Sequence, residues 1–357
     1  MKMYQQKAVL MIFYENFMHY FCLIKIKLMI SKKIIVFLAI IRIFCSCSQE
    51  KSYQDYTLKG QVFGTTYKIV YLNAAKNYQK SIDSLFLLMN QSLSTYIPNS
   101  DISKINKGDT LVVVDDLFVE VFQKSKRIYK ETNGYFDPSV GNLVNAWGFG
   151  PKSEMRNLTV EEVKEEMKLV GFNKVILNNR NVIKQYSKIY LDFNSIAKGF
   201  GIDVVARFFE RKKVKNFLIE IGGEIRTKGK KTGNKPWTIK LIDPIKKDSN
   251  KGFKVLDLSN KSMATSGNYR KFRLTSDGEK YVHTINPITG YAFESNLLSV
   301  SVIAALDCAD VDAYATAFMA MGLEKTKDFI RMQKKLKVIL LYSNKDGEIQ
   351  EFNNYTY

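Results

Sequence analysis

An aspartate and a threonine stand four residues apart in an otherwise apolar stretch, CADVDAYATAFMAMG (residues 308–322). In a helix, Asp312 and Thr316 would lie on one face, about one turn from each other. Two oxygen donors at this spacing suit a hard cation such as Mg²⁺, which binds few protein groups and completes its shell with water and phosphate. The stretch also fits a structural role, in which Asp310 favours the helix start and the Thr316 hydroxyl bonds back to a carbonyl.

A lysine follows a predicted strand in LDFNSIAKGFGID (residues 191–203), where Asp192 ends the strand and Lys198 opens a helix. A cation near the free N–H groups of a helix start is typical of a phosphate site. The segment lacks the complete phosphate-loop pattern, so a surface lysine is the alternative. Further along, Gly222 and Gly223 in IEIGGEI permit either the close approach of a ligand or an ordinary hairpin turn.

The body of the chain contains one histidine, His283, because His19 belongs to the N-terminal leader. A single imidazole excludes a multi-histidine metal site and leaves one candidate for acid–base work near neutral pH. The segment YVHTINPITG places His283 near the end of a predicted strand, where a surface histidine is the alternative. Cys308 is the only cysteine of the body, which excludes an intrachain disulfide and a cysteine-based zinc site.

Aromatic residues and glycines are concentrated in ETNGYFDPSVGNLVNAWGFG (residues 131–150). Phe136 and Trp147 in this segment suit a planar ligand such as a flavin or an adenine ring, and they suit a hydrophobic core equally well. We predict an irregular loop for YFDPSVGNLVNAWGFGP (residues 135–151), because it is rich in glycine, proline and aromatic residues.

The elements that must position these residues alternate irregularly, often as a pair of strands followed by a helix. This succession favours an α+β fold over a doubly wound parallel sheet. Strands are predicted at residues 56–72, KVILNN (174–179), NVIKQY (181–186) and KIYLDF (188–193); helices are predicted at about 81–97, 116–134 and 196–211.

The N-terminus has the pattern of a targeting segment. In MISKKIIVFLAIIRIFCSCSQEKS (residues 29–52), two lysines precede an apolar run that is too short for an ordinary membrane span. Ser46 directly before Cys47 predicts a bacterial lipoprotein signal with Cys47 as the lipidated first residue; a plain signal peptide or an uncleaved anchor is the alternative. We therefore expect a leader over residues 1–47 with translation starting at Met29, a tether over 48–58 and one domain over 59–357.

The composition of the 357-residue chain, with 46% hydrophobic residues and a formal net charge of +19, permits a packed core. An excess of cations favours anionic partners such as nucleic acid, phosphate ligands or an anionic membrane face. The lysines are spread along the chain rather than gathered in one block, so we expect no nucleic-acid partner.

Taken in order, these segments resemble the ApbE family of FAD:protein FMN transferases, also called flavin transferases. The likeness runs from about Gly60 to Gly322. It implies an α+β fold of the T-fold type, with two similar halves of antiparallel sheet packed with helices. It also implies Mg²⁺-dependent transfer of FMN from FAD to a threonine or serine hydroxyl of a partner flavoprotein, through a phosphoester bond and with release of AMP. The matching blocks are FGTTYKI, LSTYIPNSDISKIN, TNGYFDPSVGNLVNAWGFG, LDFNSIAKGFGID, NFLIEIGGEI, ATSGNYRKF, HTINPITG and SVSVIAALDCADVDAYATAFMAMG.

The resemblance implies a role for individual residues. The Asp312 carboxylate, the Thr316 hydroxyl and the backbone carbonyl of Ser195 would bind Mg²⁺. Lys198 would neutralise charge on the pyrophosphate, and His283 would help to deprotonate the acceptor hydroxyl. Asn286 stands where many members have aspartate, and Tyr135 stands where a smaller residue is frequent. Contacts with FAD are implied for Phe63, Tyr96, Tyr135, Phe136, Asp137, Asp192, Lys198, Asn286 and Ala315.

Two other functions remain compatible with these residues. One is an FAD pyrophosphatase, in which water replaces the acceptor hydroxyl, and the other is a non-enzymatic carrier that binds FAD without cleaving it. The leader and the resemblance together predict a lipid-anchored protein on the periplasmic side of the inner membrane of a bacterial cell envelope, where it acts on exported flavoproteins.

Overall fold

The computed structural model describes residues 14, 17–29, 31, 53–151, 158–242, 252–267, 272–274, 280–282, 284–292 and 295–355. It divides the chain into a leader unit, Met1–Ser52, and a body, Tyr53–Tyr357. In the leader unit residues 17–29 are helical, whereas Cys47 lies outside the described residues. No helix in the described ranges is both long and apolar enough to cross a membrane.

The body is built on an eight-stranded sheet in which every neighbouring pair of strands is antiparallel. The first strand begins at Gln54, so it includes residues that the sequence analysis assigned to the tether. In spatial order the strands are β1 (Gln54–Val62), β2 (Thr65–Ala74), β5 (Asn216–Ile221), β6 (Glu224–Lys228), β9 (Ser262–Gly267), β12 (Leu297–Ala304), β13 (Lys337–Ser343) and β14 (Ile349–Asn353).

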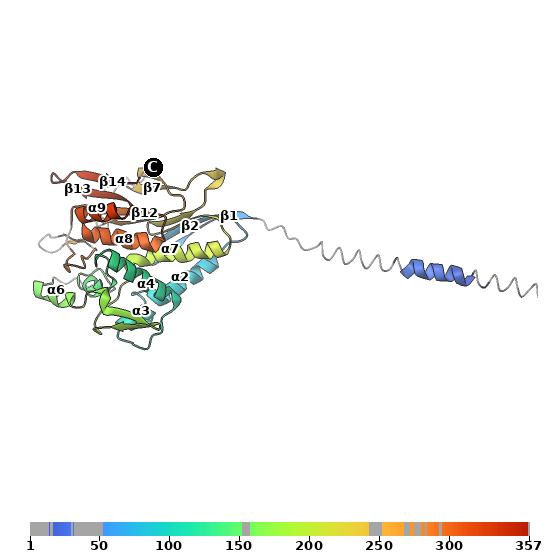
Figure 1. Cartoon of the computed structure of the whole chain (residues 1–357), viewed down its shortest axis with the longest axis horizontal. Coiled ribbons are helices and arrows are strands. Elements are labelled where there is room, and N and C mark those ends of the chain that lie inside the picture. The colour runs from blue at the N-terminus through green and yellow to red at the C-terminus, as the bar shows by residue number, and fades with distance from the viewer. Residues whose placement is uncertain are drawn as a thin grey trace, which may run out of the picture. The chain divides into compact units, whose positions relative to one another are not determined.

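The helices lie on one side of this sheet, and three small hairpins complete the described part of the body (Figure 1). The helices are α2 (Gln79–Leu93), α3 (Asp101–Asn106), α4 (Asp116–Glu131), α5 (Gly141–Ala146), α6 (Val160–Met167), α7 (Asn194–Arg211), α8 (Cys308–Met321) and α9 (Leu323–Met332). The hairpins are β3 (Val175–Asn178) with β4 (Asn181–Lys184), β7 (Thr238–Ile242) with β8 (Gly252–Asp257), and β10 (Phe272–Leu274) with β11 (Lys280–Val282).

The order of elements repeats within the body. Two strands, a central helix and two more strands occur first as β1, β2, α7, β5 and β6, and again as β9, β12, α8, β13 and β14. The β6–β9 ladder joins the two halves through the pairs Ile225–Met263 and Arg226–Ser262. The expected α+β fold with two similar halves of antiparallel sheet is therefore confirmed.

The two central helices approach each other unusually closely. A side chain at Gly199 of α7 would place its Cβ 2.4 Å from the carbonyl oxygen of Cys308, at the start of α8, so only glycine fits this position. Almost every residue of α8 is buried. This explains the apolar composition of the stretch, because the helix lies between the sheet and its neighbours rather than at the surface.

A buried carboxylate fixes the start of α8. Asp203 of α7 is fully buried and accepts hydrogen bonds of 2.8 Å from the backbone N–H groups of Cys308 and Ala309. Burial raises the pKa of Asp203 to about 6 against the opposing charge of Arg226, which contacts this carboxylate. Arg226 also pairs with Asp307 at 2.7 Å, so the N-terminus of α8 is tied to both α7 and β6.

Two local predictions were wrong. KIYLDF is not a strand, because its backbone N–H groups bond to side chains that are distant in sequence. Tyr190 N–H donates to the Asn142 side chain and Leu191 N–H to the Asn106 side chain, each at 2.8 Å. The predicted loop at residues 135–151 contains the 3₁₀ turn Pro138–Val140 and helix α5. Tertiary contacts decided the backbone conformation of the first segment, whereas the 3₁₀ turn of the second has a local cause, since the Asp137 side chain caps it.

We expect Asp203→Ala to lower the free energy of unfolding by about 3 kcal/mol, because it leaves two buried N–H groups and one guanidinium short of their partner. Urea denaturation measures this loss. Asp328→Ala is the matched control, since it removes an exposed carboxylate paired with Arg331 and should cost less than about 1 kcal/mol. Equal losses in the two variants would show that Asp203 does not anchor α8.

Candidate active site

The predicted metal ligands of the two helices meet where α8 crosses the first turn of α7. Asp312 is 3% exposed, and its Oδ2 accepts a hydrogen bond of 3.0 Å from the backbone N–H of Gly199. In an α-helix that N–H points toward the carbonyl four residues earlier, which is that of Ser195. The Asp312 carboxylate and the Ser195 carbonyl therefore face the same amide.

Lys198 lies between two buried carboxylates. Its Nζ is 2.6 Å from Oε1 of Glu224, the first residue of β6, whose side chain is only 3% exposed. Burial would lower the pKa of Lys198, but the negative charges of Asp312 and Glu224 outweigh it and raise that pKa above its ordinary value. Lys198 is thus held as a cation and keeps part of its side chain exposed, as a phosphate-binding group requires.

The two carboxylates respond to burial in the same direction. Burial raises the pKa of Asp312, while the charge of Lys198 and the Gly199 N–H oppose the rise. Burial also raises the pKa of Glu224, to about 7, against the charge of Lys198 and with the help of the charge of Asp312. One lysine therefore does not compensate fully for two buried carboxylates in this cluster.

The oxygen atoms of the cluster fit a hard cation. Thr316, one turn after Asp312, presents a hydroxyl 3.5 Å from the Ser266 hydroxyl of β9. Oε2 of Glu224 is buried and has no hydrogen-bond partner in the described part of the protein. Among the described residues no three His, Cys, Asp or Glu side chains cluster as in a multi-carboxylate centre. The donor set is that of a site with few protein ligands, which suits Mg²⁺.

A tight turn holds Lys198 from the other side. Gly222, which has a positive φ of 63°, lies in the β5–β6 turn and donates from its N–H to the Thr66 carbonyl at 3.0 Å. A Cβ at this position would meet the Thr65 side chain at 2.8 Å and Cδ of Lys198 at 3.3 Å. The hairpin-turn alternative for this glycine is therefore confirmed, and the turn packs closely beside a candidate site residue, whereas the approach of a ligand stays a prediction.

Asp192, just before α7, lies close enough to Tyr96, which follows α2, for its charge to act on the phenol. Asp192 is 8% exposed and accepts a 2.7 Å hydrogen bond from the Asn194 N–H at the helix start. Partial burial of the phenol and the charge of Asp192 raise the pKa of Tyr96, while its side chain remains largely exposed. An exposed aromatic ring beside a buried carboxylate is compatible with the predicted FAD contact.

Phe63 reaches the same end of the sheet from the β1–β2 turn. Its φ is 51°, and its ring packs on α7 where Gly201 leaves space, since a Cβ at Gly201 would lie 2.6 Å from the ring. The ring is half-buried and also contacts Phe86 edge-on, with 5.6 Å between centroids. Glycine at this helix position is thus explained by an aromatic contact.

Three adjacent predicted FAD contacts differ in their environment. Phe136 is buried in the main core, and the Asp137 carboxylate accepts hydrogen bonds from Ser139 and from the Phe172 N–H. Burial raises the pKa of Asp137 to about 6 although these bonds oppose the rise. Tyr135 is half-buried and its hydroxyl accepts a hydrogen bond from Lys325. In this conformation Phe136 and Asp137 support the loop, and Tyr135 remains partly accessible.

The remaining predicted residues lie on α8 or next to it. Ala315 is fully buried in the middle of α8. The Asn286 side chain donates to the Ala320 carbonyl at 3.2 Å and accepts from the Ile288 N–H, which ties its turn to the end of α8. His283 lies outside the described residues, so its role stays a prediction.

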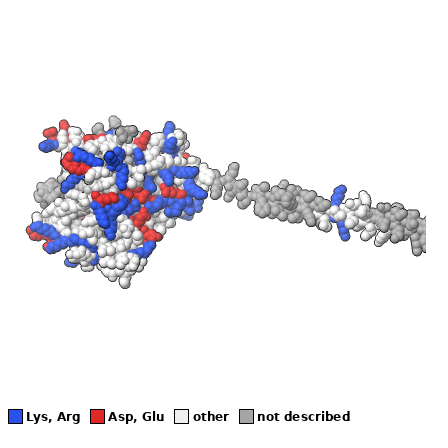
Figure 2. Space-filling model, viewed as in Figure 1, with Lys and Arg blue, Asp and Glu red and all other residues white. Residues whose placement is uncertain are grey.

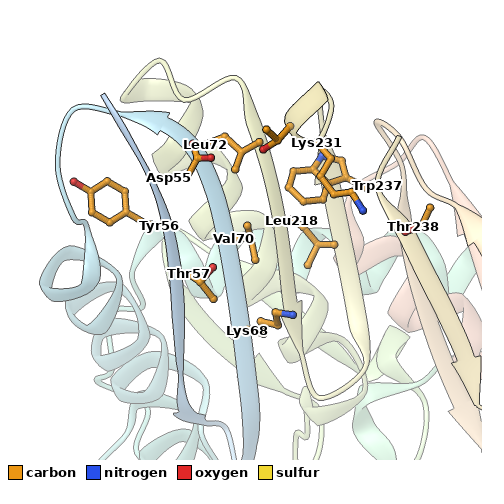
Figure 3. Close-up of a pocket in the computed structure, with 11 residues that line it drawn as sticks. Asp55, Tyr56, Thr57, Lys68, Val70, Leu72, Leu218, Lys231, Trp237 and Thr238 are labelled. Carbon is orange, nitrogen blue, oxygen red and sulfur yellow. The ribbon is translucent and has the colours of Figure 1, made fainter. Parts of the chain in front are cut away.

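A hollow with a volume of about 390 Å³ lies elsewhere, on the face of the sheet that α7 does not cover. Its lining includes Val70, Leu218 and Trp237, from β2, β5 and the segment before β7 (Figure 3). None of the predicted site residues lines it. Chemistry is therefore assigned to the polar cluster around Lys198 rather than to the hollow.

The fold and the cluster together define an α+β protein with an oxygen-rich polar centre at the start of a central helix. The family model described as "ApbE family" matches residues 63–340, and the chain belongs to the ApbE family. A curated relative from Haemophilus influenzae, named FAD:protein FMN transferase, is 32% identical over 312 residues, which cover 84% of this chain and 89% of the relative. The relative of the same name from Vibrio cholerae is 32% identical over 321 residues, which cover 88% and 94%.

Solved structures agree with this assignment. The flavin transferase ApbE from Vibrio cholerae aligns with a TM-score of 0.75 at 31% identity, covering 85% of this chain and 97% of that one. The ApbE protein from Thermotoga maritima aligns with a TM-score of 0.73 at 27% identity, covering 83% and 96%. The family resemblance seen in the sequence is thereby confirmed.

Sequence reasoning missed Glu224 as a member of the cluster. The residue stands in the block NFLIEIGGEI, directly after the two glycines that were singled out. A carboxylate at the first position of a strand after a Gly-Gly turn was the available signal. Its pairing with a lysine of another element required the tertiary structure.

We compare the free energy of unfolding of the metal-free wild type with that of Glu224→Gln. As the pH rises from about 5 to about 8, we expect the wild type to lose about 2 kcal/mol relative to the variant. The folded-state pKa of Glu224 is raised from 4.5 to about 7, so its contribution is fully present below about pH 4.5 and is lost as the pH rises through about 7. Glutamine mimics the protonated form at every pH. Urea titrations with a chelator measure the difference, and exposed Glu324→Gln is the control. A difference that does not change with pH would contradict the perturbed state of Glu224.

Proposed function

We propose that this protein transfers FMN from FAD to a threonine or serine hydroxyl of an exported partner flavoprotein, with Mg²⁺ as cofactor. The acceptor oxygen attacks the phosphorus of the FMN moiety, a phosphoester bond forms, the pyrophosphate bond breaks and AMP leaves. One observation carries the proposal: in a chain that belongs to the ApbE family, Asp312 of α8 and Glu224 of β6 converge on Lys198 and its neighbouring backbone near the start of α7. The curated relatives named above are FAD:protein FMN transferases.

Lys198 is the group best suited to the pyrophosphate. It is held as a cation by two carboxylates and is partly exposed, so it can neutralise charge on a non-bridging oxygen without a change of protonation. The Glu224 contact fixes the direction of its side chain. Positioning of this kind supplies much of the rate enhancement in phosphoryl transfer.

Asp312, Thr316 and the Ser195 carbonyl would hold the cation, and Oε2 of Glu224, which has no partner among the described residues, belongs to the same cluster. When bound, Mg²⁺ neutralises the negative charge that builds up on the phosphate oxygens. The rigid packing of α7 against α8 keeps these oxygen donors in place before the ligand arrives.

The acceptor hydroxyl needs a base, because an alcohol is a weak nucleophile at neutral pH. His283 is the only imidazole of the body, and it stands in a block that matches the family. In this proposal His283 takes the proton of the acceptor hydroxyl during attack. Tyr96, Tyr135 and Phe63 contribute exposed or half-buried rings for the planar parts of FAD.

The leader supports a place for this reaction outside the cytoplasm. In the proposal Cys47 is lipidated and anchors the body to the periplasmic side of the inner membrane of a bacterial envelope. The support is the sequence alone: basic residues, a short apolar run and a small residue before Cys47.

Two measurements separate transfer from the alternatives. FMN and AMP that appear from FAD and Mg²⁺ without an acceptor indicate a pyrophosphatase, and covalent in-gel flavin fluorescence on a candidate exported flavoprotein indicates transfer. Tight FAD binding without either product indicates a carrier. Since the acceptor hydroxyl and water would use the same cluster, the product, rather than the site, distinguishes the first two functions.

We expect Asp312→Asn to lower flavin transfer at least about 100-fold, because it removes the carboxylate charge proposed to hold Mg²⁺. Asp310→Asn is the matched control on the same helix: its carboxylate faces Arg127 and Lys124, at 2.7 and 3.2 Å, rather than the cluster. In-gel flavin fluorescence over a Mg²⁺ titration measures both. Full activity of Asp312→Asn without added metal would refute the metal assignment.

We expect His283→Gln to slow transfer about 100-fold while FAD still binds, because only proton abstraction from the acceptor is affected. Single-turnover transfer and FAD titration by fluorescence quenching measure the two quantities separately. An unchanged transfer rate would remove His283 from the mechanism.

A further inference from the structure

Strand register brings four segments that are distant in sequence to one end of the sheet. Gln54 pairs with Ala74, Leu72 with Asn216 and Phe217 with Lys228. The start of β1, the end of β2, the start of β5 and the end of β6 therefore lie side by side. The C-terminus of α7 also reaches this end, because it leads into β5 after a short turn.

Cationic side chains gather at this end, which we call the basic end. All of them are exposed. On the face shown in Figure 2, Lys and Arg side chains crowd the part of the body where β1 begins, with a few acidic ones among them. The basic end consists of Lys76, Lys80, Arg211, Lys212, Lys213, Lys215, Lys228, Lys230, Lys231 and Lys235.

Most of this charge is not neutralised by ion pairs among the described residues. In the described part of the body only Lys228 of the basic end forms an ion pair, with Glu210 at 2.7 Å. Lys212 lies over the ring of Phe208 and Lys76 over that of Tyr78, which leaves their ammonium groups toward solvent. Lys231 also borders the hollow of Figure 3.

The basic end and the candidate active site lie at opposite ends of the same strands. Glu224 begins β6 and Lys228 ends it, while the Gly222–Gly223 turn closes β5 beside Lys198. Six residues of β5 separate the two ends by about 20 Å. An acceptor protein that donates its hydroxyl at the cluster would therefore approach from the end away from these lysines.

We propose that the basic end docks on the surface of an anionic phospholipid bilayer and turns the candidate active site away from it. The body enters its sheet at Gln54, only seven residues after Cys47, so an anchor at Cys47 would hold this end within about 25 Å of the lipid. Clustered lysines next to a membrane anchor bind anionic headgroups. The attraction between these lysines and an anionic surface does not depend on the anchor, whereas the functional role of the orientation rests on the proposed function.

The test compares two variants of the full chain that both carry Cys47→Ser, so that no lipid is attached. One replaces Lys212, Lys213, Lys230 and Lys231 with Gln. The matched control replaces four exposed lysines outside the basic end, Lys126, Lys164, Lys188 and Lys345, with Gln. Co-sedimentation with vesicles of phosphatidylglycerol and phosphatidylcholine, and with phosphatidylcholine alone, is measured at low and at high salt.

We expect the first variant to bind anionic vesicles at least about tenfold more weakly than the unsubstituted chain, because each lysine near an anionic surface contributes about fivefold in affinity. The control should change less than about twofold, and high salt should remove the difference. Equal losses in both variants, or no loss in either, would overturn the proposal. Binding requires no turnover, so its outcome is independent of the proposed function.

A transfer assay without vesicles separates lipid docking from docking of the acceptor. Both variants should transfer flavin as fast as the unsubstituted chain, since none of the substituted lysines belongs to the cluster around Lys198. If the variant with substitutions in the basic end keeps vesicle binding but loses transfer, the basic end binds the acceptor protein. That result would also overturn the proposal. If no chain transfers flavin, the proposed function fails while the vesicle result stands.

Discussion

The close contact between α7 and α8 is the constraint on which the site depends. Glycine in a helix costs about 1 kcal/mol relative to alanine, and α7 contains two, Gly199 and Gly201. Gly199 lets the backbone of α8 approach, so that Asp312 can bond the Gly199 N–H. Gly201 leaves space for the ring of Phe63. The two glycines lower the helix propensity of α7, and in return they allow a carboxylate and an aromatic ring to contact its first half.

Buried charge is the second organising feature. Asp203 caps α8 and pairs with Arg226, while one turn earlier on α7 Lys198 lies between Asp312 and Glu224. The first group is satisfied by hydrogen bonds within the protein. In the second group Oε2 of Glu224 has no partner among the residues that the structure describes, and burial raises the pKa of both carboxylates. A fixed structural network therefore stands beside a cluster whose charge balance would improve when a cation binds.

The antiparallel sheet separates two kinds of surface. Because neighbouring strands run in opposite directions, turns alternate between its ends, and each end collects segments that are distant in sequence. At one end of the β5–β6 pair the Gly222–Gly223 turn lies beside Lys198 of α7, and at the other end lie the exposed lysines that follow α7 and β6. The lysines look evenly spread in the sequence, yet strand pairing brings many of them together.

The sequence by itself determined the helices with clear periodicity, the α+β class and the spacing of Asp312 and Thr316, because these depend on residues close together in the chain. Ordered blocks also determined the family. Only the tertiary structure decided that the backbone of KIYLDF bonds to side chains rather than to a neighbouring strand. It also decided that Glu224 pairs with Lys198 and that the exposed lysines gather at the basic end. Each of these depends on contacts between residues far apart in sequence, which local periodicity does not encode.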